Sequence, residues 1–519
     1  MIRRPPLTIA GAVVCVLLLV SGACAGNELH AAKGAGSTTS VPASSPTTPQ
    51  ATGPATTGGA ATGEGTTPSR TNALGGWRPG PLRWSSCASH PGFKCATLTV
   101  PLDWDKTTGT TVDLALARQP ASGKRKGYLL INPGGPGASG LDFTFGNPLS
   151  DAIAATYDIV GWDPRGVGKS THLKCGSKVE PFLRQDPDPD TTAEQTALDD
   201  AAKAVANECA SSDLALLSHL GTDDVARELE ALRMALDDQQ LNFVGFSYGT
   251  YIGLRYAALF PTHIRSMVLD GVLDSTQRLE DWLAGQARAI DASLTRAFES
   301  CRRSSGCPVD DLAATYDQVR AKVETSPLPT HQGRPLGPAE LATAALYVSY
   351  DPSNWRLLGP ALAAAAKGDG TSLMELAQGY YDFGGFTAYA GVECIDSAHP
   401  TGPAEYAAFA KRLEQISPRF GGNVANELLP CAFWPVPPQD HTGPVRAAGA
   451  PPILVLGNRG DAATPYQNSV TVAKNLADGH LVSNDGEGHT SYGRDGCVTD
   501  VVDRYVLDLR VPATDPDCK

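Results

Sequence analysis

The sequence has no excess of positive charge and, after its first 24 residues, no long hydrophobic run. Its 519 residues carry a formal net charge of −13, which argues against binding to nucleic acid or to an anionic membrane surface by overall charge. The apolar runs after residue 24 are too short to span a bilayer. With 42% hydrophobic and 19% charged residues, the rest is typical of a globular protein with a large core.

The sequence also lacks the motifs of metal sites and of nucleotide-binding phosphate loops. No C-x-x-C pair or His/Cys cluster has zinc spacing, so the sequence predicts no metal site. Residues 166–170 end in Gly-Lys-Ser, as a phosphate loop does, but such a loop needs glycine at position 163, where the chain has Asp163. We therefore expect no nucleotide, metal or other cofactor.

The first 23 residues have the pattern of a lipoprotein signal peptide. Two arginines precede an apolar stretch, residues 7–20, that is too short for a comfortable transmembrane helix. Small residues then lead to Cys24, which would be lipidated after cleavage, although Ser21 stands where the bacterial lipobox has Leu. The alternative is an ordinary signal peptide cut at Ala23 or Ala25. Either way, we expect an exported protein, lipid-anchored to the outer face of the membrane or secreted.

Residues 24–76 consist mainly of Ala, Gly, Ser, Thr and Pro, with almost no charged or aromatic side chains. Such a segment cannot bury enough apolar surface to offset the entropy lost on ordering. We expect a disordered tether there.

The cysteine count indicates disulfides. Of the 12 cysteines, Cys15 lies in the signal peptide and Cys24 ends it, which leaves ten. An even number in an exported chain implies disulfide bonds, although sequence alone does not fix their connectivity. The spacing suggests the local pairs Cys87–Cys95, Cys175–Cys209, Cys301–Cys307, Cys394–Cys431 and Cys497–Cys518.

Short apolar runs predict a mostly parallel sheet. Residues 96–100 and 112–117 alternate like an antiparallel hairpin. Continuous apolar runs elsewhere are typical of strands buried on both faces. Residues 222–235 have the pattern of a helix with Thr222 as N-cap. The expected buried strands are 128–131, 157–163, 242–244, 266–269, 453–456 and 479–482.

Helices alternate with these strands until about residue 274, which indicates an α/β fold with helices on both faces of the sheet. Residues 275–448 instead have a mostly helical pattern rich in Ala and Leu, and the strand pattern resumes near residue 451. We expect a helical lid, 275–448, inserted between two parts of one α/β core, 77–274 and 449–519.

The core contains a candidate nucleophile, Ser247, in the pattern G-x-S-x-G. A buried strand leads into the turn, and a helix is expected to follow from Thr250. Gly245 and Gly249 have no Cβ, so strand and helix can approach closely around a strained corner. The serine hydroxyl would lie at a helix N-terminus, where partial positive charge favours a developing anion. The pattern alone also fits an ordinary turn with a hydrogen-bonded serine.

A serine nucleophile needs a base and an acid that orients the base. His489 lies in a Gly-rich loop after the last strand and is the predicted base. Asp461 directly follows the strand 453–456 and is the predicted acid. Asp270, at the end of the preceding core strand, is the alternative acid.

Backbone N–H groups would bind the oxyanion. The candidates are the N–H of Tyr248, next to the nucleophile, and that of Gly135, in the Gly-rich loop after strand 128–131. The chain order Ser247, Asp461, His489 is that of the α/β-hydrolases.

Five motifs together resemble the secreted tripeptidyl aminopeptidase branch of the proline-iminopeptidase-like hydrolases, and the signal and tether are similar to those of mycobacterial envelope lipoproteins of this branch. The motifs are NPGGPG at 132–137, WDPRGVGKS at 162–170, GFSYGT at 245–250, DAATP at 461–465 and GH at 488–489. The resemblance implies an α/β-hydrolase fold with a helical lid and a serine peptidase that releases short peptides from free N-termini of peptides or proteins.

Such an exopeptidase must bind the substrate ammonium, and buried carboxylates suit that task. In the lid, E-C-x-D at 393–396 and C-x-x-W-P at 431–435 also resemble the family, so Glu393 and Asp396 are the candidates for substrate binding. The alternative assigns these two residues a structural place beside a disulfide. A carboxylesterase or lipase of the same fold is the second hypothesis, and a catalytically inactive envelope binding protein is the third.

Overall fold

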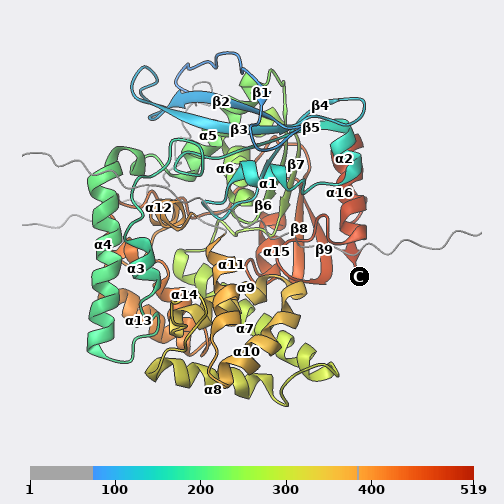
Figure 1. Cartoon of the computed structure of the whole chain (residues 1–519). Helices are drawn as coiled ribbons and strands as arrows, with labels where there is room; N and C mark the ends of the chain where they lie inside the picture. Colours follow the sequence, from blue (N-terminus) through green and yellow to red (C-terminus); the bar gives the residue numbers. More distant parts are fainter. Residues whose placement is uncertain (1–73, 383–384) are drawn as a thin grey trace, which may run out of the picture. The chain divides into compact units, whose positions relative to one another are not determined.

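The computed structural model describes residues 74–382 and 385–519, so the predicted signal peptide, Cys24 and nearly all of the predicted tether lie outside the described residues. Within them, the strands form one sheet in the order β1-β2-β3-β5-β4-β6-β7-β8-β9-β10 (Figure 1). The strands are β1 (Ser85–Ser86), β2 (Lys94–Pro101), β3 (Thr111–Gln119), β4 (Gly127–Asn132), β5 (Tyr157–Trp162), β6 (Leu241–Phe246), β7 (Ile264–Asp270), β8 (Ile453–Gly460), β9 (Gly479–Glu487) and β10 (Asp517–Cys518).

The predicted antiparallel hairpin and the mostly parallel sheet are both confirmed. The neighbouring pairs β1–β2, β2–β3 and β3–β5 are antiparallel. In the β2–β3 hairpin, Val100 lies opposite Val112. From β5 across β4, β6, β7, β8 and β9 to β10, every pair is parallel. Strand β9 continues five residues beyond its predicted end at Val482, to Glu487.

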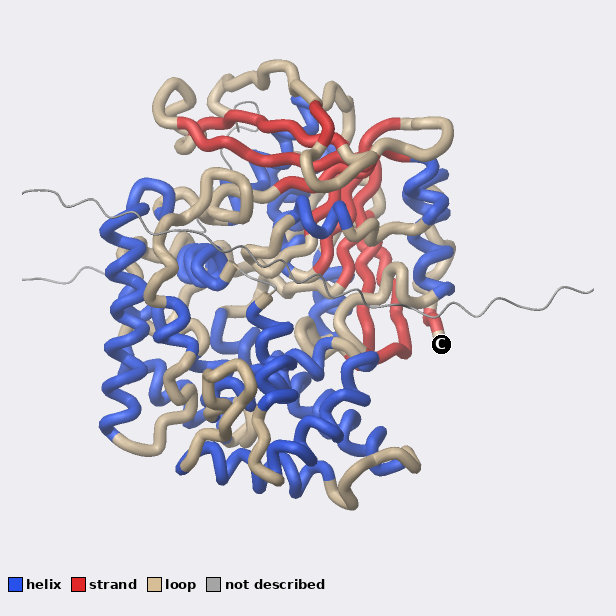
Figure 2. The backbone as a smooth tube through the Cα atoms, viewed as in Figure 1, coloured by secondary structure: helices blue, strands red, loops and turns tan. Residues whose placement is uncertain are grey.

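Helices cover both faces of the parallel strands (Figure 2). Alternate strand residues belong to different apolar clusters. In β6, Phe243 packs into one cluster and Val244 into the other. This period of two is the one that a strand buried on both faces requires. The first cluster includes α5 (Thr222–Ala235), α6 (Tyr248–Leu259) and α15 (Tyr466–Asn475), and the second includes α2 (Asp151–Thr156) and α16 (Gly496–Asp508).

Between β7 and β8 the chain forms a helical insert, which we define as α7 to α14 with η3 and η4 and which falls within the predicted range 275–448. Its elements are α7 (Leu279–Arg303), α8 (Leu312–Thr325), α9 (Pro338–Tyr350), η3 (Pro352–Asn354), α10 (Trp355–Ala366), α11 (Thr371–Tyr381), α12 (Phe386–Asp396), α13 (Pro403–Glu414), α14 (Gly421–Asn426) and η4 (Leu429–Phe433). The remaining helices are α1 (Gly140–Phe145), α3 (Val179–Leu183), α4 (Thr192–Leu217) and η2 (Pro261–His263).

Helices α3 and α4 precede the insert in sequence but pack with it. Leu198, Ala202 and Val205 of α4 share one apolar cluster with helices of the insert. These residues recur at helical spacing and form one face of α4. The predicted start of the lid at residue 275 therefore does not include every helix of this layer.

Helix α5 begins one residue earlier than a Thr222 cap implies. Gly221 is the N-cap and Thr222 is the first helical residue, so the predicted capping role of Thr222 is wrong.

The ten described cysteines form five disulfides, and these are the local pairs that the spacing suggests. Among the described residues, a search for helices long and apolar enough to cross a membrane finds none.

Candidate active site

Ser247 occupies a strained turn between β6 and α6. Its backbone has φ 54° and ψ −126°, in the positive-φ region that residues with a side chain rarely adopt. A Cβ on Gly245 would lie 2.4 Å from the carbonyl oxygen of Gly249, and a Cβ on Gly249 would lie 2.5 Å from that of Asn132. Only glycine fits at these two positions, which explains the G-x-S-x-G pattern physically.

Hydrogen bonds hold this turn. The Ser247 N–H donates to the carbonyl oxygen of Asp270 at the end of β7, at 2.8 Å. The N–H and hydroxyl of Thr250 donate to the carbonyl oxygen of Ser247 at 2.9 and 2.6 Å. The serine is therefore fixed by the neighbouring strand and by the first turn of its own helix.

His489 and Asp461 form a direct pair. The Nδ1 atom of His489 lies 2.9 and 3.0 Å from the two carboxylate oxygens of Asp461. Asp461 is buried and also accepts from the N–H groups of Ala463 and Thr464, both at 2.8 Å. Burial lowers the pKa of His489 and the Asp461 carboxylate raises it, and the net shift is upward. The carboxylate thus stabilises the protonated imidazole that a general base becomes.

The other ring nitrogen of His489 is available. Among the described residues, Nε2 has no hydrogen-bond partner, and His489 lines the same cavity as Ser247. The backbone at 270–271 contacts both residues, because Asp270 accepts from the Ser247 N–H and a Cβ on Gly271 would lie 3.0 Å from Cε1 of His489. Ser247, His489 and Asp461 thus follow three separate strands, and Ser247 and His489 line one cavity.

Asp270 takes a different position from Asp461. Its buried carboxylate accepts from the N–H groups of Ser491 and Tyr492 at 3.0 and 2.8 Å, and from the Ser491 hydroxyl at 3.2 Å. Burial raises the pKa of this carboxyl. Asp270 thus holds the loop after His489, and the carboxylate hydrogen-bonded to the His489 ring is Asp461.

The Gly-rich loop after β4 lies against the nucleophile turn. A Cβ on Gly134 would be 2.5 Å from the backbone nitrogen of Tyr248. The Gly134 N–H already donates to Oδ1 of Asn132 at 2.9 Å. Gly135, with φ 108°, lines the cavity beside Ser247. The structure therefore places both predicted oxyanion donors, Gly135 and Tyr248, next to the serine.

The cavity has a volume of about 1450 Å³ and is lined by both the core and the insert. Ser247 and His489 belong to the core, whereas Tyr350, Tyr380 and Glu427 belong to the insert. Ring centroids are 5.9 Å apart for His489 and Tyr350, and 6.2 Å apart for Tyr350 and Tyr380. A row of aromatic rings therefore leads away from the histidine into the insert.

Glu427 also lines the cavity, beside Tyr380, and is not among the site residues that the sequence predicts. Its carboxylate accepts from the hydroxyls of Tyr380 and Tyr389 at 3.3 and 3.4 Å. Burial raises the pKa of Glu427 to about 7. Within the sequence the residue has no recognisable motif, and in the structure it directly follows the short helix α14, which ends at Asn426.

Glu393 and Asp396 do not line this cavity. Both are buried, at 2% and 3% exposure. Burial, together with the charges of Asp396 and Glu427, raises the pKa of Glu393 well above its ordinary value. Asp396 instead contacts Thr222 and Tyr248. The geometry does not favour the substrate-binding role predicted for these two carboxylates.

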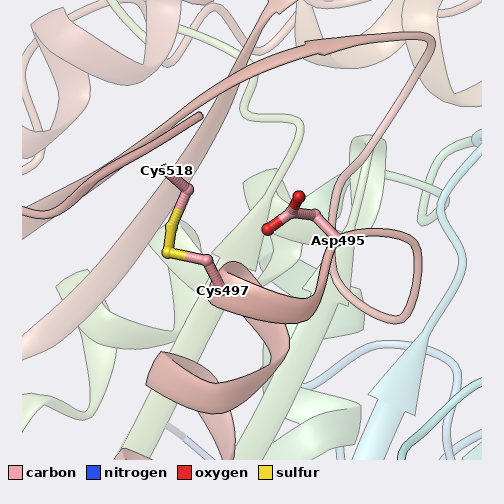
Figure 3. Close-up of side chains that lie close together, drawn as sticks. All are labelled: Asp495, Cys497 and Cys518. Carbon is pink, nitrogen blue, oxygen red and sulfur yellow. A yellow bond between two sulfur atoms is a disulfide. The ribbon is translucent and has the colours of Figure 1, made fainter.

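One group of potential metal ligands lies elsewhere, at Asp495, Cys497 and Cys518 (Figure 3). The two sulfur atoms are joined in a disulfide, so neither is the thiolate that binds a metal. The Asp495 carboxylate accepts from the Val498 N–H at the start of α16. We propose no metal site from this group.

Comparison with known proteins agrees with this geometry. Residues 417–518 match the family model described as TAP-like protein. The chain is 32% identical over 476 residues to the serine protease Hip1 of Mycobacterium tuberculosis, covering 84% of this chain and 91% of that protein.

Two other relatives align over similar lengths. Carboxylesterase B of Mycobacterium tuberculosis is 34% identical over 469 residues, covering 84% of this chain and 89% of that protein. Tripeptidyl aminopeptidase of Streptomyces lividans is 31% identical over 470 residues, covering 84% and 86%. The resemblance indicated by the five motifs is confirmed. The chain therefore belongs to the tripeptidyl aminopeptidase-like family of α/β-hydrolases.

Proposed function

We propose that the protein is an exported serine aminopeptidase that releases short peptides from free N-termini. Ser247 attacks the scissile carbonyl carbon while His489 accepts the hydroxyl proton at Nε2. The N–H groups of Gly135 and Tyr248 bind the oxyanion, and Asp461 stabilises the imidazolium. His489 then gives the proton to the leaving amine, and water hydrolyses the acyl-enzyme by the same path.

The observation that carries this proposal is the arrangement of three side chains. Ser247 stands in a positive-φ turn, the Asp461–His489 pair lies at 2.9 Å, and the free Nε2 of His489 shares the cavity with the serine. The serine protease and tripeptidyl aminopeptidase relatives support amide bonds as the substrate.

Glu427 is our candidate for the substrate ammonium, in place of Glu393 and Asp396. Its carboxylate lines the cavity, and two tyrosine hydroxyls orient it. An ammonium ion favours the charged form of a carboxyl whose pKa burial has raised to about 7. The aromatic row between His489 and Glu427 would then contact the short peptide that is released.

Replacement of Ser247 tests the reaction. A purified S247A variant should keep the melting temperature of the wild type and lose turnover of tripeptide amides by at least about 10³-fold. Profiling of the N-terminal products from a peptide library would give the length released. Turnover of S247A at the wild-type rate would refute the assignment.

An esterase of the same fold is the second candidate. The 34% identity to a carboxylesterase supports it. The two activities share the same catalytic residues and differ in the substrate that the insert admits. Rates on tripeptide amides and on short-chain esters, measured with the same enzyme preparation, separate them, because an esterase should leave the amides uncleaved.

We further propose that Cys24 is the lipidated N-terminal residue, that residues 24–76 tether the enzyme to the outer face of the membrane, and that residues 77–274 and 449–519 form one core around the insert 275–448. The signal pattern and composition support the first two statements. Mass spectrometry of the mature N-terminus distinguishes an acylated Cys24 from an unmodified terminus created by cleavage at Ala23 or Ala25.

A further inference from the structure

Asp396 lies at the end of α12, far in sequence from the core residues that it contacts. Its Oδ1 atom accepts from the Thr222 N–H at 2.8 Å, and its Oδ2 atom accepts from the hydroxyls of both Thr222 and Tyr248. The carboxylate is 3% exposed. Both oxygens are therefore engaged with core residues rather than with solvent or the cavity.

The carboxylate caps helix α5 from outside its own segment. The N-cap residue, Gly221, has no side chain, and a Cβ there would lie 3.3 Å from Oδ1 of Asp396 and 2.9 Å from Gln439. A negative charge is favoured at a helix N-terminus, where backbone N–H groups are unpaired. The core thus offers a site for this anion, and the insert supplies it.

Tyr248 connects that anion to the nucleophile turn. It is the first residue of α6, and its backbone N–H is a proposed oxyanion donor. Burial, together with the nearby charge of Asp396, raises the pKa of its hydroxyl well above the ordinary value, so the hydroxyl keeps its proton and donates. The side chain is consequently fixed at both ends, at the backbone beside Ser247 and at the carboxylate.

The positive-φ conformation of Ser247 makes such an anchor useful. A strained residue persists only where the surrounding contacts fix it. Thr250 and Asp270 hold the carbonyl oxygen and the N–H of Ser247, whereas the Tyr248 hydroxyl donates to Asp396 and lies in contact with the Thr222 hydroxyl. The disulfide Cys394–Cys431 joins α12 to η4 two residues before Asp396.

We propose that Asp396 is a positioning residue through which the insert holds the Tyr248 peptide in place for oxyanion binding. This inference rests on the proposed function, since it assumes that Ser247 is acylated and that Tyr248 donates to the oxyanion. It assigns the carboxylate of the E-C-x-D segment to the catalytic step and not to substrate binding.

The test compares D396N, Y248F and the double variant with the wild type. Each should lower kcat on a tripeptide amide by roughly 10- to 100-fold, with KM changed by less than about twofold, because a displaced oxyanion donor acts on the transition state. Affinity for a peptidyl trifluoromethyl ketone, which forms the oxyanion adduct, should weaken by a similar factor. The double variant should be no slower than the slower single variant, because both substitutions break the same bond.

Y251F is the matched control. Tyr251 lies on the same helix with its ring 5.7 Å from that of Tyr248, and its hydroxyl makes no hydrogen bond to Asp396. We expect its kcat to equal that of the wild type.

Two results would overturn the inference. One is a Y248F variant with wild-type kcat and wild-type affinity for the ketone. The other is a D396N variant whose melting temperature falls while its kcat and its affinity for the ketone stay at the wild-type values. Failure of the proposed function appears separately, as an S247A variant that still turns over or a wild-type enzyme that the ketone does not inhibit.

Discussion

The sheet and the insert contribute to one cavity by different means. Ser247, Asp461 and His489 each follow a parallel strand, and the ladder of backbone hydrogen bonds aligns those strand ends. Tyr350 and Glu427 come from helix ends of the insert, where packing against other helices sets their positions. Under the proposed function, the sheet supplies the catalytic residues and the insert supplies the residues that contact the substrate.

The insert also holds part of the catalytic apparatus. The backbone N–H of His489 donates to the carbonyl oxygen of Tyr350 at 2.9 Å. Arg494, after the histidine, pairs with Asp351 at 2.9 Å, and Glu487, before it, pairs with Arg296 at 2.7 Å. The histidine loop is therefore bound to the insert on both sides, so the insert is more than a cover over the cavity.

The largest effect should come from the core. We expect D461N to lower kcat by about 10⁴-fold, because the amide no longer stabilises the imidazolium or fixes its tautomer. Activity requires neutral His489, so kcat/KM should rise with pH through the pKa of this residue, which lies above its ordinary value. In D461N the carboxylate that raises the pKa of His489 is gone, whereas burial still lowers it. The acid limb of the pH profile should therefore move to lower pH. An unmoved acid limb would contradict the pairing.

The next effect should come from the substrate end of the insert. We expect E427Q to raise KM for a peptide amide with a free N-terminus by roughly 10- to 100-fold, as expected for loss of a charge-assisted hydrogen bond. Its KM for the same peptide with an acetylated N-terminus should not change. In the wild type, KM for the free peptide should rise as pH falls below about 7, where Glu427 becomes protonated.

D382N is the control for that comparison. Asp382 also lines the cavity, but it is exposed, so water screens its charge. Equal increases in KM for both variants, or an equal increase for acetylated peptide, would show that Glu427 acts through general charge or packing and not by binding the ammonium.

The smallest effect should come from the ion pair between the regions. Arg494 and Asp351 are 46% and 31% exposed, so R494Q should lower the free energy of unfolding by less than about 1 kcal/mol. The rate should change less than about threefold, since the Tyr350 carbonyl still accepts from His489. Denaturant unfolding and kcat check this. A tenfold fall in kcat without loss of stability would show that the ion pair positions the histidine.

The sequence predicts the core well because its signals are local. Apolar runs identify the strands, and Ser247, Asp461 and His489 follow strand ends directly, so parallel topology brings them together. The choice between Asp461 and Asp270 depended on side-chain direction, which only the structure shows.

The insert was less predictable because its contacts join distant segments. Asp396 is hydrogen-bonded to Thr222, 174 residues away in the sequence. Glu427 is hydrogen-bonded to Tyr380, 47 residues away. Apolar periodicity reveals that such segments are helical but not which helices pack together. For the same reason, the sequence does not predict that α4, which precedes the insert, packs with it.

The central claim is that Ser247 is the nucleophile and that His489 activates it. Peptide mapping of the wild-type protein after reaction with a fluorophosphonate tests this most directly. The account predicts one adduct, on Ser247, that does not form in the H489A variant under the same conditions. An adduct on another residue, or equal labelling of Ser247 in H489A, would contradict it.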